Sequence, residues 1–195
     1  MNKNRLEAFS DGVLAIIITI MVLEIKVPHG SDWTVLRPLI PTFISYILSF
    51  TFIGIYWANH HHMLHSVKGV TGSMIWANIN LLFWLSLIPF ATGWMGENHF
   101  AANTVSLYGL LLLLSGIAFT ILQKVIERNS LDIERLKTAF VNMKRKGIAS
   151  TIGYAAAIPL AYISPVISGV IFALISIVWL IPDKEIEKAL SEAGE

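Results

Sequence analysis

Six long apolar blocks dominate this sequence. They cover about residues 6–27, 39–58, 72–92, 103–124, 147–163 and 165–182. A helix needs roughly 20 mostly apolar residues to cross about 30 Å of hydrocarbon, and the blocks are near that length. Charged residues make up only 14% of the 195 residues, whereas a typical soluble domain carries about 25%. The sequence therefore predicts an all-α membrane protein with six transmembrane helices per chain.

Proline and small residues mark the limits of the blocks. Pro28 follows the first block, and Pro38 and Pro41 fall in the opening turn of the second, where proline costs little. The block at 147–163 is short and rich in small residues, which predicts close helix packing rather than lipid exposure. No stretch like "RLEAFSDG" recurs, so we expect a single domain over residues 1–195.

The positive charges predict how the helices are oriented. With both termini in the cytoplasm, twelve of the fourteen Lys and Arg residues lie on the inner side, as the positive-inside rule requires. The basic segment 123–147 is then a cytoplasmic connection, which we expect to extend the fourth helix and then lie amphipathic at the membrane surface. The inner residues are Lys3, Arg5, Lys68, Lys124, Arg128, Arg135, Lys137, Lys144, Arg145, Lys146, Lys184 and Lys188, and the outer ones are Lys26 and Arg37.

Composition excludes several other classes of protein. Cysteine is absent, so the chain has no disulfide framework and no thiolate metal site. The net charge of +1 predicts no nucleic-acid partner. The first block ends in "LEIKVP" without a small-residue cleavage site, so we expect a retained helix rather than a signal peptide.

The first apolar block opens with charged residues. Arg5 suits an orientation anchor, and the carboxylates of Glu7 and Asp11 suit a helix N-terminus. Asp11, however, lies close to the hydrocarbon boundary, where an ionised carboxylate needs a partner. It is also four residues from Glu7, an unfavourable spacing for like charges. We therefore expect a group on another helix to hold Asp11.

Beyond Asp11, one face of the same helix carries a stripe at three- and four-residue steps. Because this helix is apolar all round, the spacing alone leaves open whether the stripe faces lipid, the protein core or a pore. The stripe consists of Gly12, Ile16, Thr19, Ile20 and Leu23.

Three motifs, in chain order, resemble those of a known family. "RLEAFSDG" at 5–12 fits R-x-x-x-F-S-D, and "YWANHHHML" at 56–64 is similar to a W-x-x-H-H segment. "WANINLLFWLSLIPFAT" at 76–92 is similar to a W-x-N segment with a P-F ending. Together with the six predicted helices, the first half of the chain resembles the transmembrane-protein-175 family of potassium channels. One departure is His62, where relatives often carry a basic residue.

The resemblance implies a homotetramer in the plasma membrane of a prokaryote, with the first helix of each chain lining a central pore. Carried over to this chain, the constrictions are Ile16, Ile20 and Leu23, with the hydroxyl of Thr19 beside them. The sequence has no T-V-G-Y-G filter, so rings of apolar side chains would gate by dewetting and select by dehydration. The implied function is a potassium-permeable channel with modest preference over sodium. Potassium is the permeant ion, and no cofactor or resident metal is expected.

The resemblance also implies a structural network that fixes the cytoplasmic end of the first helix. Its members on that helix are Arg5, Phe9, Ser10 and Asp11. We expect Asp11 to be the centre of this network, because several donors on the second and third helices suit a carboxylate. These donors are the side chains of Trp57, His60 or His61, Trp76 and Asn78.

The histidines of the second helix allow other functions. The pairs 61/65 and 62/65 share a helical face, as two-histidine metal sites require, but no carboxylate or cysteine neighbour completes a site. Packing, hydrogen bonding and proton sensing remain open for the cluster. The alternative function is a proton-coupled transporter or proton-permeable channel that uses Asp11 and the His60–His65 cluster. Transporters generally have midplane charges and inverted repeats, which the sequence lacks.

A hydrolytic site is the last alternative. Ser10, Asp11 and a histidine contain the ingredients of a catalytic triad. Adjacent residues on a helix diverge by about 100°, however, and no nucleophile motif is present. We therefore predict no catalytic residues and no enzyme activity.

Overall fold

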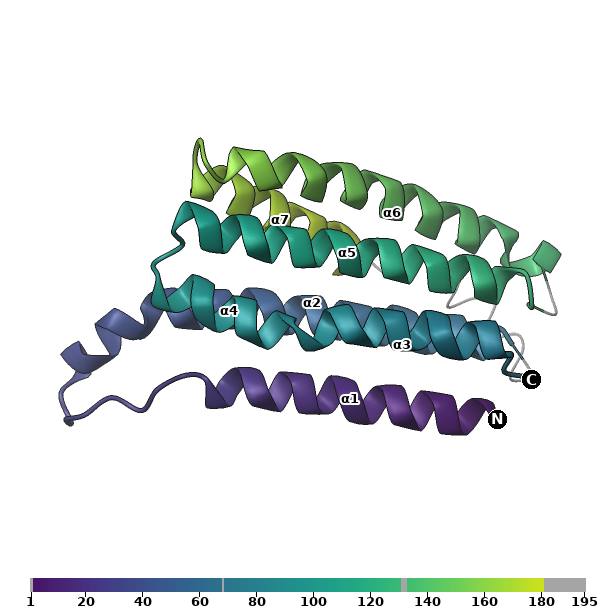
Figure 1. Cartoon of the computed structure of the whole chain (residues 1–195), viewed down its shortest axis with the longest axis horizontal. Coiled ribbons are helices and arrows are strands. Elements are labelled where there is room, and N and C mark those ends of the chain that lie inside the picture. Colours follow the sequence, from purple (N-terminus) through teal and green to yellow (C-terminus); the bar gives the residue numbers. More distant parts are fainter. Residues whose placement is uncertain (1, 68, 131–132, 181–195) are drawn as a thin grey trace.

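The computed structural model describes residues 2–67, 69–130 and 133–180, which form helices joined by short loops (Figure 1). The prediction of an all-α fold is confirmed for these residues. In chain order the elements are α1 (Lys3–Leu23), the 3-10 helix η1 (Trp33–Leu39), α2 (Ile40–His65), α3 (Gly72–Ser86), α4 (Ile88–Glu97), α5 (Ala102–Glu127), α6 (Ile133–Leu160) and α7 (Pro165–Leu180).

The helices lie side by side along the long axis of the molecule (Figure 1). Helix α1 lies at one edge and packs on α2, α3 and α4. Helices α5, α6 and α7 form the opposite side, with α2 and the α3–α4 pair between them. Helix α1 is therefore covered by its own chain from one side only.

Four helical segments are long and apolar enough to cross a membrane: Lys3–Leu23, Trp33–Leu64, Gly72–Glu97 and Ala102–Glu127. The chain is thus a multi-pass membrane protein. Helix α7 is apolar but shorter, with 16 described residues, and the first half of α6 carries several charges. Six crossings and a single domain remain predictions. Lys68, Lys184, Lys188 and the last two residues of the sixth predicted block lie outside the described residues.

The third predicted helix is in fact two helices. Helix α3 ends at Ser86 and α4 begins at Ile88, with Leu87 as the shared cap. Pro89 explains the break, because proline lacks the backbone N–H and its ring clashes with the carbonyl four residues earlier. Helix α2 also differs from the prediction: it extends to His65 and so includes the whole histidine cluster.

Helix α6 corrects the predicted cytoplasmic connection. Helix α5 ends at Glu127, where the backbone N–H groups of Asn129 and Ser130 make short turn bonds. Asn and Ser favour such turns because their side chains compete for backbone groups. From Ile133 the chain forms one helix of 28 residues. The expected amphipathic segment and the expected fifth span are therefore parts of the same helix.

Hydroxyl groups and one glycine hold α4 close to its neighbours. Ser49 Oγ of α2 lies 2.6 Å from Thr92 Oγ1 of α4 and 2.9 Å from the hydroxyl oxygen of Tyr108 on α5. Such pairing is needed at membrane depth, where no water satisfies polar groups. At Gly96 a Cβ would lie 2.7 Å from both Ser45 Oγ and the backbone Cα of Thr42. Only glycine permits this approach of α4 to α2.

Replacing Gly96 by alanine is expected to destabilise the fold. The added methyl group forces α4 away from α2, and overpacking of this kind costs about 1–3 kcal/mol. The thermal unfolding midpoint of the protein in detergent measures this loss. Gly54→Ala is the matched control, because a Cβ at Gly54 meets nothing within 4 Å. Equal midpoints for the two variants would show that the close approach at Gly96 is unimportant.

Candidate functional site

The two faces of α1 have opposite surroundings. One face is buried against α2, α3 and α4 and consists of Leu6, Ser10, Leu14, Ile17 and Met21. The four residues predicted to line a pore lie on the other face. Ile16 is 58% exposed and Leu23 is 80% exposed, and Thr19 and Ile20 are also exposed. We call Ile16, Thr19, Ile20 and Leu23 the α1 stripe.

The hydroxyl of Thr19 is the one polar side-chain group of the α1 stripe. Its Oγ1 donates a hydrogen bond of 2.9 Å to the carbonyl oxygen of Ile16. This bond uses the hydroxyl proton and leaves the oxygen lone pairs available as acceptors. An oxygen in this state can accept a hydrogen bond from water or contact a cation.

A groove separates part of α1 from α3 and α4. Its volume is about 550 Å³, and Ile16 and Ile20 are among its apolar lining residues. Glu24 and Glu97 contribute carboxylates to the lining. Glu97 forms an ion pair of 2.5 Å with Lys26, and its hydrogen bond and charge raise the pKa of Lys26 above the ordinary value. The charge of Glu97 is therefore countered within the chain.

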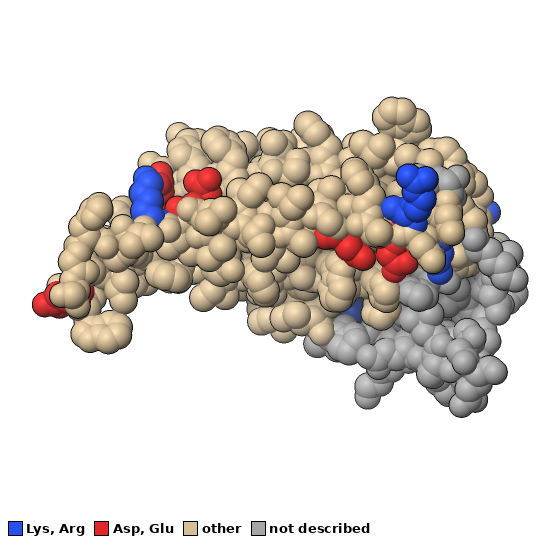
Figure 2. All heavy atoms as spheres, turned by 90° about the horizontal axis from the view of Figure 1, so that it is seen from below, with Lys and Arg blue, Asp and Glu red and all other residues tan. Residues whose placement is uncertain are grey.

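Charged side chains are unevenly placed on the face of the molecule that includes α1. Figure 2 shows two separate groups of charged residues with an uncharged band between them. Around the α1 stripe the side chains of α1 from Gly12 to Leu23 are all uncharged. An uncharged surface of this width suits a helix in the middle of a membrane.

Two contacts join the first turns of α1 to the end of α2. Trp57 Nε1 donates a hydrogen bond of 2.9 Å to Asp11 Oδ1, so one of the expected partners of Asp11 is in place. His61 Nδ1 lies 2.7 Å from Glu7 Oε1. The two contacting residues are four positions apart on each helix, and they run in opposite chain directions. This pattern is expected for antiparallel neighbours. We call Glu7–His61 and Asp11–Trp57 the α1–α2 contacts.

A third contact joins α1, α2 and α3 in the interior. His60 Nε2 lies 2.7 Å from Asn78 Oδ1, and Asn78 Nδ2 donates a 2.9 Å hydrogen bond to Ser10 Oγ. Ser10 Oγ in turn donates to the carbonyl oxygen of Leu6 at 2.9 Å. Ser10, His60 and Asn78 are all buried. Asn78 is thus the centre of this chain of bonds. The sequence analysis had instead predicted that Asp11 is the centre of the network.

The structure does not bring every predicted network residue together. Arg5, Phe9 and Trp76 are exposed, and in the described part of the chain their side chains make no hydrogen bond or ion pair. Glu7 was missed as a network member. The signal for it was available, because Glu7/Asp11 on α1 and Trp57/His61 on α2 share the same four-residue spacing.

The histidines of α2 have different polar neighbours. His60 contacts Asn78, His61 contacts Glu7, and the rings of His61 and His62 meet edge to face at 5.9 Å. The side chain of His65 lies outside the described residues. Among the described residues, no group of three potential ligands of the His, Cys, Asp or Glu type could hold a metal ion.

Comparison with known proteins decides the family. A family model described as "Endosomal/lysosomal potassium channel TMEM175" matches residues 5–89, which include the first two motifs and the third as far as Pro89. A potassium channel of Chryseobacterium sp. (strain P1-3) is 54% identical over 192 residues, covering 98% of this chain and 100% of that one. The chain belongs to the TMEM175 family.

Two further TMEM175 relatives extend the comparison. The crystal structure of a lysosomal potassium-selective channel TMEM175 homologue from Chamaesiphon minutus superposes with a TM-score of 0.78 at 27% identity. The match covers 92% of this chain and 96% of that one, so the fold is shared well beyond the three motifs. The endosomal/lysosomal proton channel TMEM175 of Gallus gallus is 36% identical over 103 residues, 47% of this chain and 21% of that protein.

Asn78→Ala is expected to destabilise the protein more than a change of the same type nearby. It removes partners of Ser10 and His60, and each buried polar group left without a partner costs about 1–3 kcal/mol. Asn80→Ala on the same helix is the control, because Asn80 is only half-buried and makes no side-chain hydrogen bond within the described chain. The thermal unfolding midpoints of both variants in detergent test this, and a smaller loss for Asn78→Ala would contradict it.

Proposed function

We propose that the protein is a potassium-permeable channel in which the α1 helices of four identical chains surround a central pore. The observation that carries the proposal is the uncovered α1 stripe on a membrane-spanning helix of a TMEM175 family member. The potassium channel of Chryseobacterium, similar over its whole length, supports potassium as the permeant ion. We assign the protein no enzymatic activity, because TMEM175 is a family of ion channels.

A ring requires several copies of the stripe. Helix α1 contacts α2, α3 and α4 of its own chain on one side and presents Ile16 and Leu23 on the other. Identical faces arranged around a symmetry axis close into a ring, as cyclic homo-oligomers do. We therefore propose a homotetramer, in which each position of the stripe contributes four side chains to one level of the pore.

Dehydration is the proposed source of selectivity. Apolar rings at Ile16, Ile20 and Leu23 exclude the outer waters of a passing ion, and hydrophobic constrictions also gate by dewetting. Potassium holds its water less tightly than sodium, so it passes such a ring at lower cost. The outward lone pairs of Thr19 Oγ1 replace part of the lost hydration. This device offers no fitted cage of oxygens, and the preference for potassium is accordingly modest.

The contacts at the start of α1 have a positioning role in this proposal. The α1–α2 contacts and the Ser10–Asn78 bond hold one side of α1. The α1 stripe lies on a different side and is therefore directed away from the subunit core. Arg5, Phe9 and Trp76 lie on the outside of the single chain, where contacts with a neighbouring subunit or with lipid are open to them.

We propose a plasma-membrane location in a prokaryote, with six crossings and both termini in the cytoplasm. The Chryseobacterium relative supports a bacterial setting. The excess of Lys and Arg on one side of the predicted spans supports this orientation. In this orientation the α1–α2 contacts lie at the cytoplasmic end of the pore, and the Lys26–Glu97 pair lies at the outer end.

Proton permeation is a second candidate, favoured by the name of the Gallus gallus relative and by the histidines of α2. The buried hydrogen-bond chain that starts at His60 does not lead to the α1 stripe, however. The chain from His60 through Asn78 and Ser10 ends at the carbonyl of Leu6, on the buried face of α1. His60 Nδ1 is buried and has no partner among the described residues. A proton-permeable pore would therefore conduct through its water rather than along the His60–Asn78–Ser10 chain.

Currents in bilayers test the proposed function. Purified protein under potassium/sodium bi-ionic conditions is expected to give a reversal potential shifted toward that of potassium, and its mass in detergent is expected to equal four chains. A second recording with a proton gradient measures proton permeability. Transport that stops without a proton gradient would show a coupled transporter and would contradict the channel. A mass of one or two chains would contradict the ring.

Ile16→Asn is expected to raise conductance and lower the preference for potassium. A polar ring is wetted, so sodium no longer loses as much hydration at the constriction. Val22→Asn is the control: Val22 is 46% exposed on the same helix and lies about 120° around it from Ile16. Ile17 is unsuitable as a control, because its side chain is only 3% exposed and a polar residue there would disrupt the core. Identical recordings for both Asn variants would exclude Ile16 from the pore.

A further inference from the structure

The apolar rings of the proposed pore do not explain how anions are excluded. An apolar ring rejects ions by the cost of removing their water, and this cost is similar for potassium and chloride. From Gly12 to Leu23 every side chain of α1 is uncharged. The outward lone pairs of Thr19 Oγ1 favour a cation only at direct contact. A pore for potassium therefore needs a negative charge nearby that acts over a longer range.

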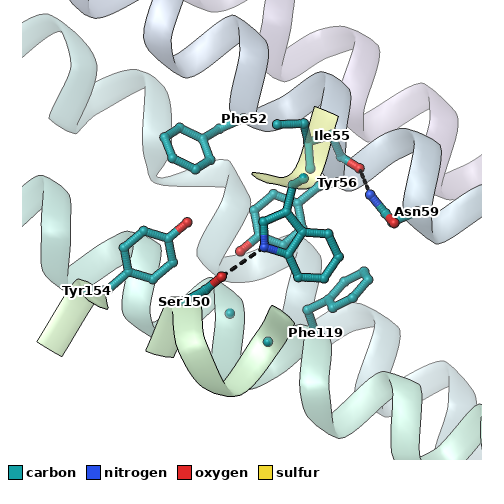
Figure 3. A pocket seen from close by; sticks show the side chains of 10 residues that line it. Phe52, Ile55, Tyr56, Asn59, Phe119, Ser150 and Tyr154 are labelled. Atoms are coloured by element: carbon teal, nitrogen blue, oxygen red, sulfur yellow. Dashed lines mark hydrogen bonds between the residues drawn. The ribbon is translucent and has the colours of Figure 1, made fainter. Parts of the chain in front are cut away.

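Charges elsewhere in the chain do not meet this need. The cavity between α2, α5, α6 and α7 has no charged side chain among its described lining residues (Figure 3). At the start of α1 the carboxylates of Glu7 and Asp11 contact side chains of α2. Arg5 lies about three turns before Ile16 on the same face and is positive. The remaining position for such a charge along α1 is its outer end.

Glu24 directly follows the last residue of the α1 stripe. It caps the C-terminus of α1, is exposed, and lies four residues beyond Ile20, about 40° around the helix. It lines the same groove as Ile16 and Ile20. Its side chain lies next to α4, because a Cβ at Gly93 would be 3.9 Å from Glu24 Oε2. The carboxylate is thus placed beside the outer end of the stripe.

The lysine near Glu24 leaves its charge uncancelled. Lys26 forms the 2.5 Å ion pair with Glu97. The hydrogen bond and charge of Glu97, and to a smaller extent the charge of Glu24, raise the pKa of Lys26. One lysine thus faces two carboxylates, and one negative charge per chain remains. The whole predicted outer side has the same excess, with the cations Lys26 and Arg37 against the carboxylates of Glu24, Asp32 and Glu97.

The fold gains nothing from a carboxylate at this position. The C-terminus of a helix carries a partial negative charge, which repels an acid. Among the described residues Glu24 makes no hydrogen bond or ion pair through its side chain. The carboxylate and the helix end therefore both add negative potential at the outer end of α1.

We propose that Glu24 makes the pore selective for cations over anions. This inference rests on the proposed function, because it needs four α1 helices around one axis. Four carboxylates then surround the outer mouth, and rings of Asp or Glu are a means by which cation channels select. At 0.1 M salt their potential extends about 10 Å. It concentrates potassium next to Leu23 and depletes chloride, whereas the apolar rings discriminate potassium from sodium.

Reversal potentials in a gradient of potassium chloride test this role, with the whole protein in bilayers. The wild-type protein is expected to give a potential close to that of potassium. Glu24→Gln is expected to lower the potassium/chloride permeability ratio about five-fold at 0.1 M salt and to leave the potassium/sodium ratio unchanged. At 1 M salt the two proteins are expected to converge, because the screening length falls to about 3 Å. Glu24→Asp keeps the charge and is expected to retain the wild-type ratio.

The double variant Lys26→Gln/Glu97→Gln is the matched control. It removes one charge of each sign, so the net charge of the outer end and the potassium/chloride ratio are expected to stay the same. A wild-type unfolding midpoint for Glu24→Gln would show that its fold is intact.

Three results would overturn the role of Glu24 while the channel itself stands. These are a wild-type protein that conducts potassium and chloride equally well, a Glu24→Gln variant as cation-selective as the wild type, and an equal loss of selectivity in the double variant. The absence of any potassium current through the wild-type protein would instead contradict the proposed function, and this role with it.

Discussion

The proposed site depends on one constraint, the fixed orientation of α1 about its own axis, which decides which of its faces is directed toward the core. From Val13 to Leu23 this helix is apolar nearly all round, so burial of hydrophobic surface alone does not select one face for the core. The polar groups of its first turns do select one. Asp11, Ser10 and Glu7 each contact a group on α2 or α3. A turn of one residue, about 100°, would break all three contacts and leave buried polar groups unpaired.

The same principle acts along the whole bundle, because polar groups at membrane depth must be satisfied within the protein. Ser49, Thr92 and Tyr108 join α2, α4 and α5, and Ser168 Oγ donates a 2.7 Å hydrogen bond to the carbonyl of Ala157, joining α7 to α6. These small groups fix the relative positions of helices whose surfaces are otherwise smooth and apolar.

The sequence predicted the helices from their hydrophobic blocks, and it was wrong where charge and packing compete. The first half of α6 has too many charges for a hydrophobic block, but its buried residues Phe140 and Met143 pack on the bundle, and Gln123 Nε2 donates to the carbonyl of Phe140 at 3.1 Å. Tertiary contacts of this kind cannot be seen in hydropathy. Trp57 was one of several donors predicted for Asp11, and the sequence alone did not choose among them. The central place of Asn78 was not, since it depends on how three helices meet.

The separation between the two faces of α1 has a consequence for how the proposed pore works. The polar chain through Ser10 lies on the buried face, and the α1 stripe lies on the uncovered face. In the described residues, no side-chain hydrogen bond joins the buried face of α1 to the α1 stripe. A substitution in the His60–Asn78–Ser10 hydrogen-bond chain therefore acts on permeation only by rotating or tilting α1 as a rigid body. Such a movement shifts Ile16, Thr19, Ile20 and Leu23 together, so the rings of the proposed pore would widen or narrow as a unit rather than one at a time.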